Sequence, residues 1–170
     1  DVEATPARTF DEVAATKMMI ERTNQRFDVK PDRLVADTAY GTSKFLGWLV
    51  GTGITPHIPV WDKANRDDSI FSRSDFAFDK ETNEYTCQDG KTLRTTGKIH
   101  DGRTILYRAS KHDCDTCPLK PRCCPNVPFR KMPRAVHEEA REYALTLMDT
   151  PAFAKSRDEL KIFVMRFAHL

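Results

Sequence analysis

Arg33-Leu34-Val35-Ala36-Asp37 is a short apolar run that ends in a carboxylate. Such a run is typical of a buried strand whose last residue emerges at the edge of a sheet. Before it, apolar residues recur at helical spacing over about 10–27, behind a Thr9-Phe10-Asp11-Glu12 capping box. After it, Thr42 is placed to cap a second helix, and 54–60 predicts another extended segment. The order helix, strand, helix, strand indicates an α/β layer.

The pattern changes after Trp61. Short alternating stretches between about 71 and 109 are separated by Asp89-Gly90 and Asp101-Gly102, and Asp-Gly is typical of tight hairpin turns. This part predicts a small antiparallel β insert. Helical spacing returns at Arg134, and a capping box at Ser156-Arg157-Asp158-Glu159 predicts a last helix with an apolar stripe.

These patterns divide the 170 residues into three parts. The first part of an α/β core occupies 1–60, a basic cysteine-containing β insert occupies 61–133, and helices that complete the core occupy 134–170. We expect no membrane span, because no apolar run approaches the about 20 residues that one requires. Because the chain lacks a starting methionine, we expect it to be a piece of a longer protein.

Positive charge is concentrated in one stretch, although the net charge of the chain is only +2. Between Lys91 and Arg134 eleven Lys and Arg stand against three acidic residues. A local excess of this size predicts a phosphate-binding surface, whereas the alternative is an ordinary solvated face. The best candidates for contacts with DNA cluster near the cysteines and are Arg122, Arg130, Lys131 and Arg134.

Five cysteines also fall in the insert. Cys114 and Cys117 form a Cys-x-x-Cys pair, which places two thiolates on one tight turn within reach of a tetrahedral ion. Cys87 and Cys123 complete a four-sulfur set, which leaves Cys124 outside it and His112 as a competing ligand. We therefore predict a structural zinc site. The alternatives are a redox pair, a disulfide or free thiols.

Six motifs, in the same order, closely resemble a group of bacterial DDE-type insertion-sequence transposases over nearly the whole chain. They are Asp1–Ala7, Ala36–Gly41, Pro56–Val60, Phe71–Phe76, Cys114–Cys123 and Met165–Leu170.

The resemblance implies a ribonuclease H-like fold in which three acidic residues hold two divalent metal ions, usually magnesium, for phosphoryl transfer. Asp37 matches the second acid. The first acid lies on a strand upstream of Asp1. The third is normally a Glu immediately before the last motif, where this sequence has Val164. Glu159, five residues earlier, lies well off the face of Val164 on a helix, and we do not expect it to substitute for the third acid.

The family function is DNA cleavage and strand transfer at the ends of a mobile element, and its partner is double-stranded DNA; a homodimer is compatible with it. With two of three acids missing, we expect this chain to be inactive alone. The alternatives are a non-catalytic DNA-binding remnant and a zinc-ribbon interaction module. The implied location is the bacterial cytoplasm, at the nucleoid. Without the resemblance, Asp37 is a strand-end carboxylate that caps the loop to the next helix, and the histidines receive no role.

Overall fold

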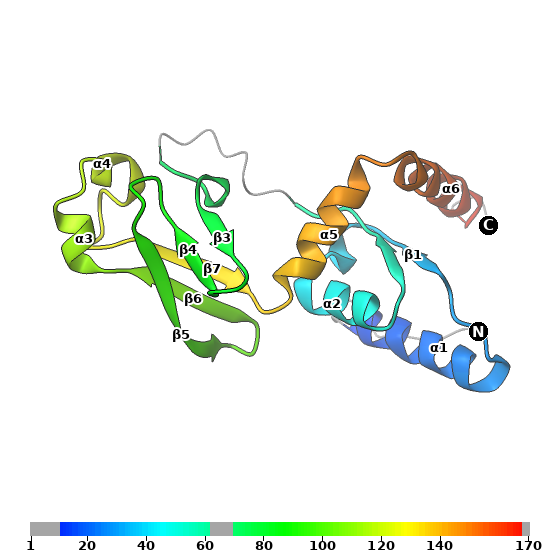
Figure 1. Cartoon of the computed structure of the whole chain (residues 1–170). Helices are drawn as coiled ribbons and strands as arrows, with labels where there is room; N and C mark the ends of the chain where they lie inside the picture. The colour runs from blue at the N-terminus through cyan, green and yellow to red at the C-terminus, as the bar shows by residue number, and fades with distance from the viewer. Residues whose placement is uncertain (1–10, 62–69, 168–170) are drawn as a thin grey trace. The chain divides into compact units, whose positions relative to one another are not determined.

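A computed structural model describes residues 11–61 and 70–167 of the chain (Figure 1). The predicted capping box at Thr9, the first motif and the end of the last one lie wholly or partly outside these ranges. The chain divides into two compact units. Unit 1 comprises Asp1–Trp61 and Glu139–Leu170, and unit 2 comprises Asp62–Glu138. Both α-helices and β-strands are present, so the expected mixed α/β class is confirmed at that level.

Unit 1 begins with the order that the sequence predicts. Helix α1 (Asp11–Phe27) is followed by strand β1 (Arg33–Val35), the 3-10 turn η1 (Thr38–Tyr40), helix α2 (Ser43–Gly51) and strand β2 (Thr55–His57). Strands β1 and β2 pair in parallel, with Leu34 opposite Pro56. The Thr42 hydroxyl accepts a hydrogen bond from the Phe45 amide, so the predicted cap of α2 is confirmed.

The core of unit 1 lies where α2 and the segment around β2 meet helix α5 (Glu138–Met148). Its buried side chains are Phe45, Leu46, Leu49, Ile54, Ile58, Val60, Ala140 and Ala144. The small alanines of α5 allow close packing against the larger side chains.

The last helix differs from its prediction. Helix α6 spans Pro151–Phe167 and begins six residues before Arg157, the first helical residue that a capping box at Ser156 predicts. The Thr150 hydroxyl instead accepts a hydrogen bond from the Phe153 amide, and Pro151 fits the first turn, where its missing N–H costs nothing. Ser156 is fully buried inside the helix. The apolar stripe predicted for this helix does not pack into the core at Phe163 and Val164, which are both exposed.

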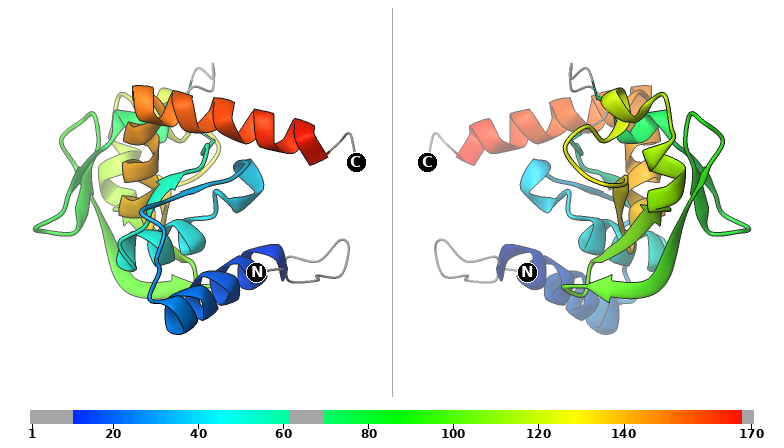
Figure 2. Two further views of the ribbon diagram at one scale, coloured as in Figure 1. Left: turned by 90° about the vertical axis from the view of Figure 1, so that its right-hand side faces the viewer. Right: turned by 90° about the vertical axis from the view of Figure 1, so that its left-hand side faces the viewer.

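Unit 2 is built on a curled five-stranded antiparallel sheet with the strands in sequence order (Figures 1 and 2). The predicted β insert is therefore confirmed. Short elements flank the sheet: the 3-10 turn η2 (Arg73–Asp75) and helices α3 (Lys111–Asp115) and α4 (Lys120–Cys123). The strands are β3 (Ala77–Asp79), β4 (Glu84–Thr86), β5 (Thr92–His100), β6 (Thr104–Ala109) and β7 (Lys131–Ala135).

The predicted hairpin turn between β5 and β6 is present. Asp101 and Gly102 have φ angles of 50° and 64°, which match a turn with two left-handed residues. The sequence missed β7. Arg134 lies on this strand, and helix α5 begins only at Glu138. The prediction that helical structure returns at Arg134 therefore placed the start of this helix too early. Because β7 pairs with β6, the insert extends beyond 133 and unit 2 reaches Glu138.

Candidate functional site

A cavity of about 460 Å³ opens in unit 1 beside the carboxyl ends of β1 and β2. In open parallel sheets this is the edge at which ligands usually bind. From the strands and the segments after them, the lining residues are Val35, Ala36, Asp37, Thr38, His57 and Pro59. One face of α6, with residues at spacings of three and four, supplies Phe153, Arg157, Leu160, Lys161, Val164 and Met165.

Asp37 lies two residues after the end of β1 and lines this cavity. Its carboxylate accepts a hydrogen bond of 2.9 Å from the Ala39 amide and so caps η1. The capping role is therefore observed. This one hydrogen bond does not use the whole hydrogen-bonding capacity of the carboxylate, because a carboxylate has two oxygens and about four lone-pair positions.

Val164, on α6, lines the same cavity and is 57% exposed. Glu159 is not among the lining residues. Its carboxylate lies 3.6 Å from Arg33 and 3.8 Å from Lys155 in two exposed ion pairs. This placement agrees with the expectation that Glu159 does not replace the missing third acid.

His57 closes the strand side of the cavity with a hydrogen bond to α6. Its Nδ1 lies 2.7 Å from the Ser156 hydroxyl, and both side chains are buried. Burial, followed by the positive charge of Arg33, lowers the pKa of His57. The sequence left this histidine without a role, because nothing in the local pattern brings residue 156 to it.

The charges around the cavity do not fit the two magnesium ions that the resemblance implies. Among the described lining residues Asp37 is the only carboxylate, whereas Arg157 and Lys161 are cations. Two-metal sites depend on several carboxylates that supply both charge and geometry. We therefore assign no metal-dependent step to these residues.

The cysteines form a second candidate site, in unit 2. All five, including Cys124, line one cavity of about 30 Å³. Burial and the neighbouring Cys124 raise the pKa of Cys123 to about 12, and burial followed by Cys114 raises the pKa of Cys124. In the ranges 11–61 and 70–167 no three His, Cys, Asp or Glu side chains are grouped closely enough to hold a metal ion.

Two of the four residues predicted to contact DNA are engaged inside unit 2. Arg134 is only 6% exposed, lies 3.8 Å from the centre of the Phe78 ring and donates to the Tyr85 hydroxyl at 3.1 Å. Arg130 is half-buried and donates to two backbone carbonyls, at 2.8 Å each. These two arginines hold the fold together and are not available to phosphates. Arg122 and Lys131 are exposed.

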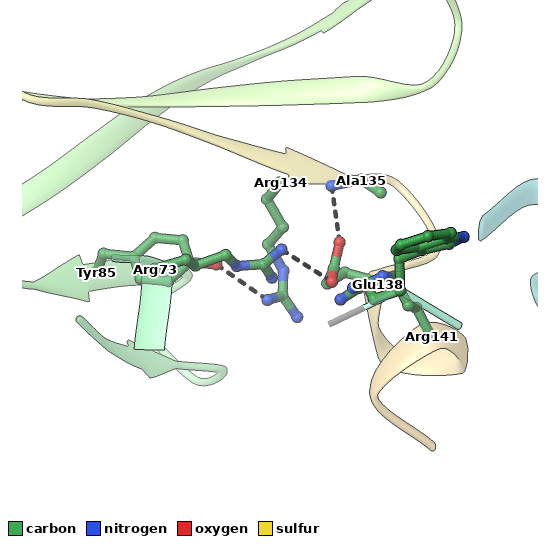
Figure 3. Close-up of polar contacts among 7 residues, drawn as sticks. Arg73, Tyr85, Arg134, Ala135, Glu138 and Arg141 are labelled. Atoms are coloured by element: carbon green, nitrogen blue, oxygen red, sulfur yellow. Dashed lines mark hydrogen bonds and ion pairs between the residues drawn. The ribbon is translucent and has the colours of Figure 1, made fainter. Parts of the chain in front are cut away.

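Figure 3 shows the network around Arg134. Glu138, which is only 3% exposed, lies 2.8 Å from an Nη atom of Arg73 and accepts a hydrogen bond of 3.2 Å from the Ala135 amide. The carboxylate therefore joins the end of β7 to η2. It is paired and hydrogen-bonded, as a buried charge must be.

A row of basic residues crosses the sheet, and the sequence analysis did not single it out. Arg94 on β5 is directly opposite Arg108 on β6, which is directly opposite Lys131 on β7. Directly paired residues project from the same face of a sheet, and all three are exposed. Only the strand register brings these distant positions together. Arg94 also forms an ion pair with Glu84 at 2.7 Å.

Within the described part of the chain, no helix combines the length and the apolar character that a membrane crossing requires. Comparison of the chain with models of known protein families, with curated proteins and with solved structures finds no match.

Proposed function

We propose that this chain is part of a DNA transposase of the DDE type and that it does not cleave DNA on its own. One observation carries this proposal: Asp37 and Val164, from a strand end and a helix far away in the sequence, line a single cavity. The resemblance assigns these two positions to the second and third acids of one metal site. A fold that separated them would have excluded the assignment.

The expected lack of DNA cleavage follows from the composition of the cavity. Val164 offers no ligand atom, and the cations Arg157 and Lys161 repel divalent metals. Asp37 alone supplies one negative charge where a two-metal site needs several.

A nicking assay tests this proposal. Supercoiled plasmid DNA is incubated with the purified chain and Mg²⁺ or Mn²⁺, and the expected result is no nicked or linear product. The Asp37→Asn variant serves as the control, because an amide oxygen can still cap η1 while the charge is lost. Metal-dependent nicking by the unchanged chain that disappears in Asp37→Asn would show that the acidic site is complete after all.

The basic row favours a second candidate function, non-catalytic binding of DNA. Like charges directly opposite one another destabilise a sheet. Arg94, Arg108 and Lys131 form two such pairs. A polyanion relieves this repulsion, and adjacent strands about 4.8 Å apart present the charges as a line that can follow a phosphate backbone.

The dependence of DNA affinity on salt concentration tests whether this basic row contacts the phosphates of DNA. Replacing Arg94, Arg108 and Lys131 together by Ala should make the slope of log affinity against log salt shallower by about 2–3, since each lost phosphate contact accounts for about 0.9. The matched control replaces Lys98, Arg103 and Lys111, which are exposed in the same unit, and removes the same charge. Equal effects of the two triple variants would contradict a localised row.

A further inference from the structure

The five cysteines surround a single small cavity, although they belong to three segments of unit 2. Cys87 follows β4, Cys114 and Cys117 lie at the end of α3, and Cys123 and Cys124 lie at the end of α4. A cavity of about 30 Å³ has room for a water-sized occupant such as one metal ion.

We propose that this cavity is a structural zinc site in which Cys87, Cys114, Cys117 and Cys123 bind one Zn²⁺. The cysteine spacing suits this ion, since Cys114 and Cys117 lie on one turn, closed by a hydrogen bond of 3.4 Å from the Cys117 amide to the Cys114 carbonyl. Zinc requires sulfurs at about 2.3 Å, a closer grouping than these side chains have in this structure, so binding would require the cysteine side chains to turn toward the cavity that they already line. Binding releases the thiol protons.

The small helices beside the cavity need such a link. Helix α3 has five residues and none of them is buried, and in α4 the one buried residue is Cys123. Elements this short have almost no apolar surface to hold them against a sheet, and in small folds a metal commonly replaces the missing core. Zinc would fasten α3, α4 and the turn after β4 to one another through the four sulfurs.

The charges lining the cavity suit a four-thiolate zinc centre, whose net charge is −2. Three cations, Lys91, Lys120 and Arg130, line it against one carboxylate, that of Asp113. Arg130 is held in place because its two Nη atoms donate to the carbonyls of Cys123 and Phe71.

One unpaired atom points to the same occupant. The Nε of Arg130 is buried and, among the described residues, has no hydrogen-bond partner. Buried N–H groups without an acceptor are costly and therefore rare. A metal-bound thiolate at the cavity would supply a negatively charged acceptor.

All five cysteines are free in this structure, so no disulfide occupies the cavity. A redox pair needs only two sulfurs. It accounts neither for Cys87 and Cys123 at the same cavity nor for the three cations around it.

The test begins with the unchanged chain, and it is independent of the proposed function in DNA transposition. Metal analysis should find close to one zinc per chain, and removal of zinc with a chelator should lower the melting temperature. Adding Co²⁺ to the metal-free protein should produce the visible absorption of tetrahedral cobalt bound by thiolates. Absence of zinc, no cobalt spectrum and an unchanged melting temperature would together overturn the site.

Two variants then test the set of ligands. Cys117→Ser should lose the zinc, whereas Cys124→Ser, in which a buried cysteine at the same cavity is replaced by the same residue, should keep it. The cobalt titration of the unchanged chain remains decisive if Cys117→Ser does not fold. Loss of zinc from Cys124→Ser together with its retention in Cys123→Ser would overturn the proposed ligand set.

Discussion

Asp37 and Val164 line the same cavity of unit 1: Asp37 follows strand β1, and Val164 lies on helix α6. Residues 157, 161 and 164 lie on one face of α6 at helical spacing, and this face lines the cavity. A carboxylate at position 164 would line the same cavity as the carboxylate of Asp37, whereas the carboxylate of Glu159 pairs with Arg33 and Lys155.

The buried ion pair of unit 2 gives the first prediction. Glu138→Ala removes the carboxylate that pairs with the Arg73 guanidinium, and removal of one member of a buried pair costs about 3–5 kcal/mol. The loss here should lie near or below the lower end of that range, because the Arg73 side chain is 31% exposed. Urea unfolding followed by circular dichroism measures this loss.

The matched control for that measurement is Glu84→Ala, which breaks the pair with Arg94. The Arg94 side chain is 73% exposed, and exposed pairs contribute about 0–1 kcal/mol. If Glu84→Ala lowered the free energy of unfolding as much as Glu138→Ala, the buried network of Figure 3 would stabilise unit 2 no more than an exposed ion pair does.

Arg134 gives the second prediction. Arg134→Lys should lower the free energy of unfolding by about 1–2 kcal/mol, because an ammonium group cannot reproduce the planar contact with Phe78 and the bond to the Tyr85 hydroxyl. The salt dependence of DNA binding should not change, since the charge is kept and the side chain is buried. Arg108→Lys, at an exposed position, should leave stability nearly unchanged. A large loss of DNA affinity in a folded Arg134→Lys variant would restore this residue as a DNA contact.

His57 gives the third prediction, a dependence of the stability of unit 1 on pH. Burial and Arg33 lower its pKa in the folded state from the usual 6.5, so the unfolded chain takes up the proton more readily. The contribution of His57 is therefore fully present above about pH 6.5, is lost as the pH falls below that value, and stops changing below the folded pKa.

Melting temperatures of the chain and of His57→Gln between pH 8 and pH 5 measure this effect. The variant should lose less stability on acidification than the unchanged chain. His137→Gln, at an exposed position, should follow the unchanged chain. Identical pH profiles for the chain and for His57→Gln would mean that this histidine does not couple to folding.

Local sequence predicted the elements that carry their own signals. Thr42 identified the start of α2, and Asp101-Gly102 identified a hairpin turn, because capping and left-handed backbone conformations demand particular residue types. The apolar run ending at Asp37 predicted β1 in the same way. The capping pattern at Ser156 predicted the wrong start for α6, because a serine can also form a buried hydrogen bond inside a helix. Ser156 forms such a bond with His57.

Long-range relationships were beyond local reasoning. The row of Arg94, Arg108 and Lys131 depends on the register of three strands, and the burial of Arg134 depends on the pairing of β7 with β6. Grouping Arg134 with exposed DNA contacts relied on its proximity in sequence to the cysteines. Charge counts in a stretch of sequence do not separate arginines that stack on rings from those that face solvent.

The binding of Mn²⁺ to a set of variants tests the central claim, that Asp37 and position 164 belong to one former metal site. Val164→Glu should tighten Mn²⁺ binding about tenfold, a coupling within the about 0.5–3 kcal/mol expected for residues that share a cavity. Adding Asp37→Asn should cancel the gain. Ile162→Glu, at a similarly exposed position of α6 that does not line the cavity, should give none. A gain that survives Asp37→Asn, or an equal gain from Ile162→Glu, would contradict the claim.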